Sequence, residues 1–274
     1  MKIGHWQLEC TPGDYEANIR KVVGGLESAD EVGLEIVSFP ESFITGYYGS
    51  EEGARAHSIA ADGAEISAFL ARVAHASTTF MVGFNEQRGD ELYNTVIVVE
   101  AGEIIGTYSK AFPCFAYFTP GRDFPIFRKG DLVYGVVICA DGGYIEPCRI
   151  LALKGAQLIF APHYNYLPPP ALINHFQKVR SDHTARAVEN GVWFLRGNNV
   201  CSGYDAGLDR EGVGYGDSYL MDPQGEISVR STRHTEMLLT AEVDVSLFAN
   251  LHNRRSIASA KALSATVAEV TADL

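Results

Sequence analysis

The sequence is short of basic residues, of paired cysteines and of long apolar runs. Its 22 basic against 34 acidic residues give a formal net charge of -12, which argues against nucleic acid as a partner because phosphate binding needs a basic surface. The five cysteines include no C-x-x-C pair, so neither a zinc site nor a disulfide framework is indicated. No apolar run reaches membrane-spanning length, and the first residues, MKIGHW, do not form a signal peptide. We therefore expect a cytoplasmic protein in a reducing compartment, with no metal and no membrane partner.

Helical and strand patterns alternate along the whole chain. The 274 residues, 46% of them hydrophobic, suit one layered α/β domain over residues 1–274. We expect strands at 2–8, 35–39, 79–85, 94–100, 104–108, 132–138, 157–161, 192–198, 217–221, 227–230 and 237–243. We expect helices at 15–29, 64–76, 146–154 and 172–190, and part of the alanine-rich tail from about 256 should also be helical.

Three chemically reactive residues follow expected strands. Glu41 lies in the segment FPES, Lys110 in TYSKAFP and Cys139 in VVICADG. Side chains at strand ends project over the sheet edge where α/β proteins usually carry out their chemistry. In one pocket, the carboxylate can take the thiol proton, the ammonium can stabilise an oxyanion, and the thiolate can attack a carbonyl or nitrile carbon. Taken singly, each residue also fits a structural role, as a helix cap, a solvated strand end and a core cysteine.

The segment around Cys139 predicts a strand, a tight turn and a helix. The apolar run 132–138 leads into the cysteine, glycines follow at 142 and 143, and Pro147 lies near the first turn of the helix. This geometry lifts the nucleophile above the sheet in other hydrolases, and the glycines allow backbone angles that residues with a Cβ resist. The helix start would favour a thiolate or an oxyanion. A buried, inert cysteine is the alternative.

Three segments together resemble a known family. FPESFITGY, YSKAFP…FTPG and ICADGGYIEP are similar to the signature blocks of the carbon-nitrogen hydrolase (nitrilase) superfamily, and further matches extend over roughly residues 1–255. The resemblance implies a four-layer αββα sandwich with Glu41 as base, Lys110 as cationic stabiliser and Cys139 as nucleophile. It also implies a thioester intermediate, release of ammonia or an amine, no cofactor, and a homodimer or higher homo-oligomer with the tail in subunit contacts.

The residues around the cysteine favour an amide as substrate. True nitrilases usually carry Trp-Glu after the cysteine, whereas this chain has Ala140-Asp141, and CADGGYIEP is closer to the CDDGNYPE block of aliphatic amidases and formamidases. We therefore expect hydrolysis of a small amide. The residues expected to contact this small molecule are Tyr47 at the end of FPESFITGY, Cys114 and Tyr117 after the lysine, Ala140 and Asp141 beside the nucleophile, and His163 and Asn165 after strand 157–161.

One acidic residue of the family pattern is missing. The family carries a second glutamate between the lysine and a Pro-Gly pair, here Pro120-Gly121, but the interval AFPCFAYFTPG contains no acid. In the family this carboxylate helps to position substrate and water. Three alternatives follow: a carboxylate such as Asp141 replaces it, a more apolar pocket takes an ester, a nitrile or a carbamoyl compound, or the chain binds a small ligand with weak or no catalysis. If none replaces it, we expect an acyl-enzyme that is hydrolysed slowly.

Overall fold

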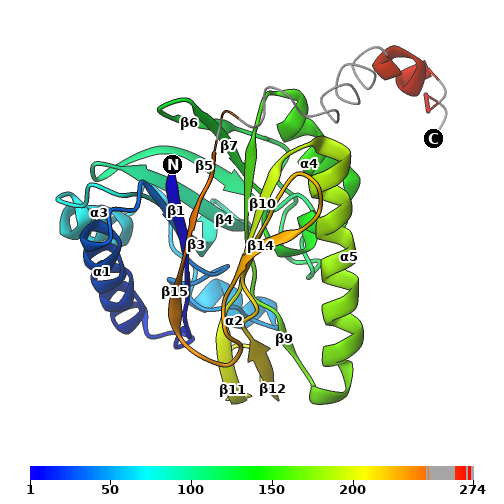
Figure 1. Ribbon diagram of the computed structural model, residues 1–274. Helices are drawn as coiled ribbons and strands as arrows, with labels where there is room; N and C mark the ends of the chain where they lie inside the picture. Colours follow the sequence, from blue (N-terminus) through cyan, green and yellow to red (C-terminus); the bar gives the residue numbers. More distant parts are fainter. Residues whose placement is uncertain (245, 247–262, 270, 273–274) are drawn as a thin grey trace.

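Two six-stranded sheets lie at the centre of the computed structural model, which describes residues 1–244, 246, 263–269 and 271–272 (Figure 1). The first sheet has the order β15-β1-β2-β3-β4-β5 and contains β1 (Lys2–Gln7), β2 (Ile36–Ser38), β3 (Thr79–Arg88), β4 (Glu91–Glu100), β5 (Glu103–Ser109) and β15 (Met237–Glu242). The second has the order β14-β13-β10-β8-β7-β6 and contains β6 (Ile126–Lys129), β7 (Leu132–Val136), β8 (Leu158–Pro162), β10 (Trp193–Gly197), β13 (Tyr219–Met221) and β14 (Ile227–Arg230).

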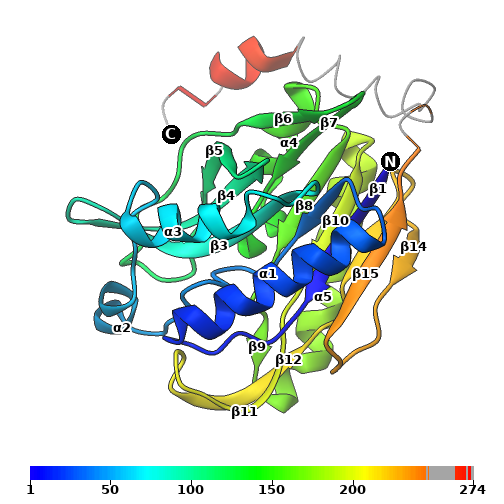
Figure 2. The same ribbon diagram turned by 90° about the vertical axis from the view of Figure 1, so that its left-hand side faces the viewer.

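Helices cover the outer faces of both sheets. α1 (Tyr15–Glu31) and α3 (Ala64–Val73) lie on the first sheet, and α4 (Ile145–Leu153) and α5 (Leu172–Asn190) lie on the second (Figures 1 and 2). The α1 helix begins where the Asp14 carboxylate accepts a hydrogen bond from the backbone N–H of Ala17 at 2.9 Å. The α5 helix ends at Gly191, which adopts a left-handed φ of 61°. A short helix, α2 (Glu51–Ala56), follows the first signature block.

Three buried apolar layers hold the sheets and helices together. The layer between the sheets includes Ile3, Met81, Val96, Val98, Tyr134, Val136, Leu158 and Phe160. The layer between the first sheet and its helices includes Ile19, Val22, Leu26, Ile66, Phe69 and Val82. The layer between the second sheet and its helices includes Val137, Cys148, Leu151, Ile159, Ala187 and Phe194. Strands that are buried on both faces have continuous apolar runs in their sequences. The αββα sandwich implied by the resemblance is confirmed.

The strand directions bring one edge of each sheet together. β2 pairs in parallel with β3, and β7 pairs in parallel with β8. β5 runs in the direction of β3 because both pair antiparallel with β4. Glu41, Lys110, Cys139 and His163 follow β2, β5, β7 and β8 respectively. The backbone N–H of Glu41 donates to the His163 carbonyl at 3.3 Å, so the two edges meet where these residues lie.

A third, small sheet was not predicted from the sequence. It consists of β9 (Tyr166–Leu167), β11 (Val200–Asp205) and β12 (Arg210–Tyr215) in the order β11-β12-β9. The segments VCSGYD and REGVGY lack a regular apolar alternation, and much of β11 is exposed. Such strands give no period-2 signal, because neither face is fully committed to the core. The short elements β6 and α2, and the 3₁₀ helices η1 (Cys139–Gly143) and η2 (Pro169–Ala171), were also not predicted.

The tail expected in subunit contacts lies mostly outside the described residues, which omit 245, 247–262, 270 and 273–274. Residues 263–269 are helical, and Leu263 and Val267 on this segment are exposed. In the part of the chain that the structure describes, every helix is too short or too polar to cross a lipid bilayer.

Candidate active site

Cys139 occupies a strained turn between the second sheet and α4. It follows the buried residues Val137 and Ile138, begins η1 and has a left-handed φ of 48°. Few residues with a Cβ adopt this conformation, and it is the form of a nucleophile elbow. The prediction that Gly142 and Gly143 carry the unusual backbone angles was wrong, because neither glycine has a positive φ. Gly142 instead provides space, since a Cβ there would lie 3.0 Å from Nε2 of His183.

The Asp141 carboxylate fixes the shape of this elbow. Oδ2 accepts hydrogen bonds from the Tyr108 hydroxyl at 2.7 Å and from the backbone N–H of Ile138 at 3.0 Å. Oδ1 accepts from the backbone N–H of Phe112 at 2.8 Å. The side chain is fully buried, and burial raises the pKa of this carboxyl above its ordinary value. Asp141 therefore joins the elbow to the loop after Lys110 and faces away from the cavity described below.

Glu41 and Lys110 form a buried ion pair. The Lys110 ammonium lies 2.6 Å from Oε1 of Glu41, and the side chains are 1% and 0% exposed. Oε1 also accepts from the Asn94 amide at 2.7 Å, and Oε2 accepts from the backbone N–H of Tyr164 at 2.9 Å. Burial alone would lower the pKa of Lys110, but the charge of Glu41, together with the neighbouring Tyr47 and cysteine side chains, raises the pKa well above its ordinary value. Lys110 is therefore held as an ammonium.

The thiol beside this pair rests in its protonated form. Burial raises the pKa of Cys139 well above its ordinary value, the Glu41 charge and a hydrogen bond to Glu41 raise it further, and the Lys110 ammonium opposes them. The Glu41 carboxylate is thus within hydrogen-bonding reach of the thiol proton, which is the geometry that a general base needs. The arrangement can remove that proton as the sulfur attacks an electrophile, rather than storing a thiolate beforehand.

Asn165 is held with its amide directed at the sulfur. Nδ2 donates to Sγ of Cys139 at 3.5 Å, and Oδ1 accepts from the Arg196 guanidinium at 2.6 Å. The backbone N–H of Asn165 donates to Oδ1 of Asn198 at 3.0 Å. Arg196 is fully buried. Because the guanidinium can only donate, it fixes which end of the Asn165 amide faces the cysteine. Neither Arg196 nor Asn94 was predicted from the sequence to have a role in the site.

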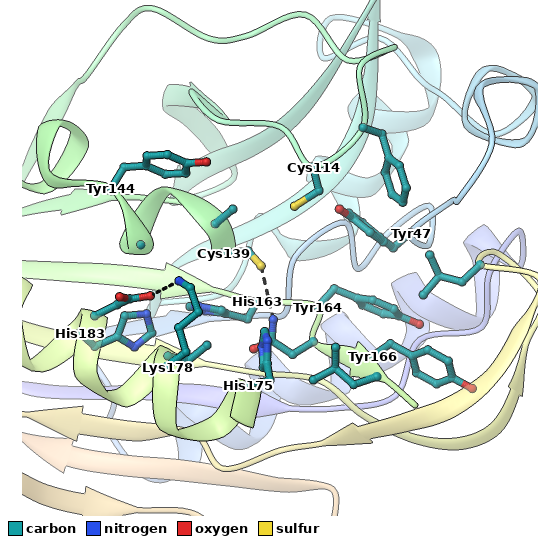
Figure 3. Close-up of a pocket in the computed structure, with 18 of the residues that line it drawn as sticks. Tyr47, Cys114, Cys139, Tyr144, His163, Tyr164, Tyr166, His175, Lys178 and His183 are labelled. Carbon is teal, nitrogen blue, oxygen red and sulfur yellow. Dashed lines mark hydrogen bonds and ion pairs between the residues drawn. The ribbon is translucent and has the colours of Figure 1, made fainter. Parts of the chain in front are cut away.

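A cavity of about 490 Å³ opens at Cys139 (Figure 3). Five of the seven residues expected to contact substrate line it: Tyr47, Cys114, Ala140, His163 and Asn165. Tyr117 and Asp141 are not among its lining residues, so the structure does not place them there. The Tyr117 hydroxyl donates to the Tyr48 carbonyl at 2.6 Å, and its ring stacks on Phe115 with centroids 5.4 Å apart.

The cavity wall opposite the elbow contains two neutral histidines. Burial lowers the pKa of His163 and of His183 well below the ordinary value, and the Arg196 charge adds to this. Nδ1 of His163 lies 2.7 Å from the Ala161 carbonyl, so Nδ1 carries the proton and Nε2 remains an acceptor. Nδ1 of His183 pairs with the Tyr219 hydroxyl at 2.7 Å. In the described ranges, no three His, Cys, Asp or Glu side chains are grouped to hold a metal ion.

The interval that lacks the glutamate places a thiol beside Lys110. Sγ of Cys114 lies 3.7 Å from the Lys110 ammonium, and this cysteine is exposed at the cavity. The carboxylate that does line the cavity comes from elsewhere, from Asp182 on α5, where it pairs with the Lys178 ammonium at 2.6 Å. This pair was not predicted from the sequence, because its position over the cavity depends on how α5 packs on the elbow.

Comparisons with known proteins agree with this architecture. A sequence model described as carbon-nitrogen hydrolase matches residues 2–253. The chain therefore belongs to the carbon-nitrogen hydrolase family, as its three sequence blocks predicted. Among solved structures, a carbon-nitrogen hydrolase from Helicobacter pylori superposes with a TM-score of 0.81 at 22% identity, covering 93% of this chain and 92% of that one. An amidase from Nesterenkonia sp. superposes with a TM-score of 0.73 at 21% identity, covering 93% and 94%.

The similar sequences are named for several different activities. A nitrilase from Pyrococcus abyssi is 30% identical over 258 residues, covering 91% of this chain and 92% of that protein. A citrullinase from Francisella tularensis is 27% identical over 271 residues, covering 93% and 92%. A glutamine-dependent NAD(+) synthetase from Thermotoga maritima is 28% identical over 252 residues, which is 87% of this chain but only 41% of the synthetase. The family is therefore established, whereas the named relatives differ in the reaction that they catalyse.

Proposed function

We propose that this enzyme hydrolyses a small amide through a thioester on Cys139, with release of ammonia or an amine. The observation that carries the proposal is the Glu41–Lys110 ion pair, which is fully buried beside a strained cysteine at the base of a cavity. A buried charge pair is expensive to maintain, and perturbed titratable groups of this kind cluster at functional sites. The pair supplies both charges that acyl transfer to a thiol requires.

The contacts suggest the role of each group in acylation. Glu41 takes the thiol proton as the sulfur of Cys139 bonds to the amide carbon, and the Lys110 ammonium stabilises the oxyanion that forms on the amide oxygen. Glu41 then delivers that proton to the amide nitrogen, the carbon–nitrogen bond breaks, and ammonia or an amine leaves. The Asn165 amide, fixed by Arg196, holds the sulfur in line for attack.

Water completes the cycle. Glu41 takes a proton from a water molecule, the resulting hydroxide attacks the thioester carbon, and the carboxylic acid leaves as Cys139 regains its proton. No acidic side chain lies between Lys110 and Gly121, so no second carboxylate from this loop can orient that water. We therefore expect hydrolysis of the acyl-enzyme to be the slow half of the reaction, with activated esters forming the acyl-enzyme faster than plain amides.

The proposal is tested by measuring ammonia release from short amides, ω-amides, carbamoyl compounds and nitriles, together with the intact mass of the protein during turnover. We expect ammonia from at least one amide class and an acyl adduct that maps to Cys139. The Cys139→Ala variant is the control, and it should release no ammonia and form no adduct. A protein that forms no adduct and hydrolyses none of these compounds, yet binds some of them, would instead be a non-catalytic ligand-binding member of the family.

A further inference from the structure

One end of the cavity carries two opposite charges side by side. Lys178 and Asp182 both line it, lie one turn apart on α5 and pair at 2.6 Å (Figure 3). Asp182 is the more enclosed partner, with 23% of its side chain exposed against 68% for Lys178. Among the described lining residues, Asp182 is the one acid, and the two basic residues are Lys178 and Arg210. The Arg210 guanidinium already donates to the Tyr166 carbonyl at 2.8 Å.

A glycine lets this pair approach the backbone of the elbow. A Cβ on Gly143 would lie 3.3 Å from Oδ2 of Asp182 and 3.6 Å from Nζ of Lys178. Gly143 has a negative φ, so a turn does not explain a glycine here, whereas the close approach of the Asp182 carboxylate does. The pair therefore lies directly against η1, the same short helix that begins with Cys139.

The distance along η1 matches a ligand longer than the simplest amides. A 3₁₀ helix rises about 2 Å per residue, which places Gly143 about 8 Å along the axis from Cys139. A side-chain amide two methylenes from an α-carbon spans three carbon–carbon bonds of about 1.5 Å, and contacts of about 3 Å at each end extend its reach to about 10 Å. The cavity of about 490 Å³ holds the volume of roughly sixteen liquid waters at about 30 Å³ each. Formamide or acetamide would leave most of it to solvent.

We propose that the Lys178–Asp182 pair recognises the α-carboxylate and the α-ammonium of an amino acid whose side-chain amide reaches Cys139. This inference rests on the proposed amide hydrolysis and adds the class of substrate. The α-carboxylate accepts from the Lys178 ammonium, the α-ammonium donates to the Asp182 carboxylate, and each protein charge keeps a partner of opposite sign when the ligand enters. An isolated cation or anion would leave one member of the pair unmatched, so a zwitterion fits this end of the cavity best.

Four amides with the same spacing between the amide and the α-carbon test the recognition of each charge. L-glutamine carries both charges, glutaramate lacks the ammonium, 4-aminobutyramide lacks the carboxylate, and butyramide lacks both. We expect kcat/KM for L-glutamine to exceed that for butyramide by about tenfold or more, since a charge-assisted hydrogen bond contributes about that factor.

Two variants separate the contribution of Lys178 from that of Asp182. Lys178→Met should lower kcat/KM about tenfold for L-glutamine and glutaramate but not for 4-aminobutyramide, and Asp182→Asn should lower it about tenfold for L-glutamine and 4-aminobutyramide but not for glutaramate. Both effects should appear mainly in KM. Arg55→Met is the matched control, because it breaks the Glu51–Arg55 pair, which has the same i,i+4 spacing and does not line the cavity.

A binding measurement keeps this inference separate from the proposed reaction. The Cys139→Ala variant cannot turn substrate over, and it should bind L-glutamine more tightly than butyramide in calorimetry, with the difference lost when Lys178→Met or Asp182→Asn is added. If the charge dependence appears in binding while no amide is hydrolysed by the wild-type protein, the recognition site stands and the proposed reaction falls. If all four amides are hydrolysed alike, if butyramide is preferred, or if neither variant changes the pattern, the recognition of a zwitterion is wrong and amide hydrolysis remains.

Discussion

Nζ of Lys110 and Oε1 of Glu41 lie 2.6 Å apart with both side chains excluded from solvent. Three further groups are fixed by this pair, because Glu41 also accepts from Asn94 and Tyr164, and Lys110 contacts Cys114. Two charges can be buried in this way only while each compensates the other. The pair therefore couples the stability of the fold to the chemistry of the site.

The first prediction separates the contribution of the ion pair to stability from its contribution to catalysis. Glu41→Gln or Lys110→Met alone should lower the free energy of unfolding by about 3–5 kcal/mol, because each leaves an uncompensated buried charge. The double variant should recover much of that stability while remaining inactive. Urea unfolding followed by circular dichroism measures the first effect, and ammonia release measures the second. A double variant as unstable as the sum of the single variants would contradict this account.

The second prediction concerns alkylation of Cys139, the proposed nucleophile. Because burial and the Glu41 charge raise the pKa of Cys139 above its ordinary value of 9.0, its reaction with iodoacetamide should be slow at neutral pH and accelerate at alkaline pH. Glu41→Gln removes a charge that opposes the thiolate, so the profile should move to lower pH. Peptide mass spectrometry follows Cys139, with the exposed Cys114 as an internal reference. If the alkylation rate of Cys139 in the wild-type protein had already reached its maximum at pH 7, the raised pKa of this thiol would be wrong.

The third prediction distinguishes positioning from substrate contact at Asp141. In Asp141→Asn, one oxygen that accepts a hydrogen bond becomes an NH₂ group facing a donor, which should cost about 1–3 kcal/mol of stability. Since the side chain does not line the cavity, kcat should fall by a similar factor for every amide while KM changes little. The exposed Asp131→Asn is the control. A rise in KM for one substrate class alone would return Asp141 to the set of substrate contacts.

The fourth prediction follows from the buried His5. Its ring nitrogens lie 2.8 Å from the Ser38 hydroxyl and 3.2 Å from the Asn198 carbonyl, and burial lowers its pKa from 6.5 to about 3. Between these pH values the unfolded chain binds the proton and the folded protein does not, so stability falls as the pH falls through this window, by up to about 1.4 kcal/mol per pH unit. In His5→Gln this part of the slope should vanish. Equal slopes for the two proteins in urea unfolding at pH 4 to 6 would rule out this origin.

The fifth prediction concerns assembly. Leu263 and Val267 are 56% and 57% exposed and lie one helical turn apart. A short helix is marginal alone, so we expect these apolar side chains to pack on a second copy in a homodimer or higher oligomer. Light scattering should give at least twice the 29.8 kDa of one chain, and Leu263→Asp with Val267→Asp should lower that mass. Val32→Asp, at an exposed apolar position on α1's end, is the control, and a wild-type monomer would refute the prediction.

The core of the site could be predicted because it depends on local patterns. Glu41 and Cys139 each follow an apolar strand and Lys110 follows a strand of a hairpin, and these patterns are visible in the sequence. Their order and spacing also carried the resemblance that gave the family and the αββα sandwich. The strain at Cys139 was assigned to the wrong residues, because two glycines suggest backbone freedom whereas the turn is completed by the cysteine and held by a carboxylate.

The remaining parts of the site depend on contacts between distant segments. Asp141 lies beside the nucleophile in sequence, which suggested a substrate contact, but it satisfies the hydroxyl of Tyr108, 33 residues away, and two backbone N–H groups. Arg196 acts through Asn165, 31 residues earlier. Lys178 and Asp182 lie on a helix that was predicted, but which of its faces lies over η1 is decided by packing against the second sheet.

The proposed catalytic groups are divided between two separately hydrogen-bonded sheets. Glu41 and Lys110 extend from the first, and Cys139 and Asn165 extend from the second. Neither sheet holds a working set by itself, so turnover requires the two to be docked in register. Ammonia release should therefore depend on that docking. During refolding, ammonia release should return after the far-ultraviolet circular dichroism signal of the strands. A solvent that loosens the layer between the sheets should abolish ammonia release while the secondary structure is still intact.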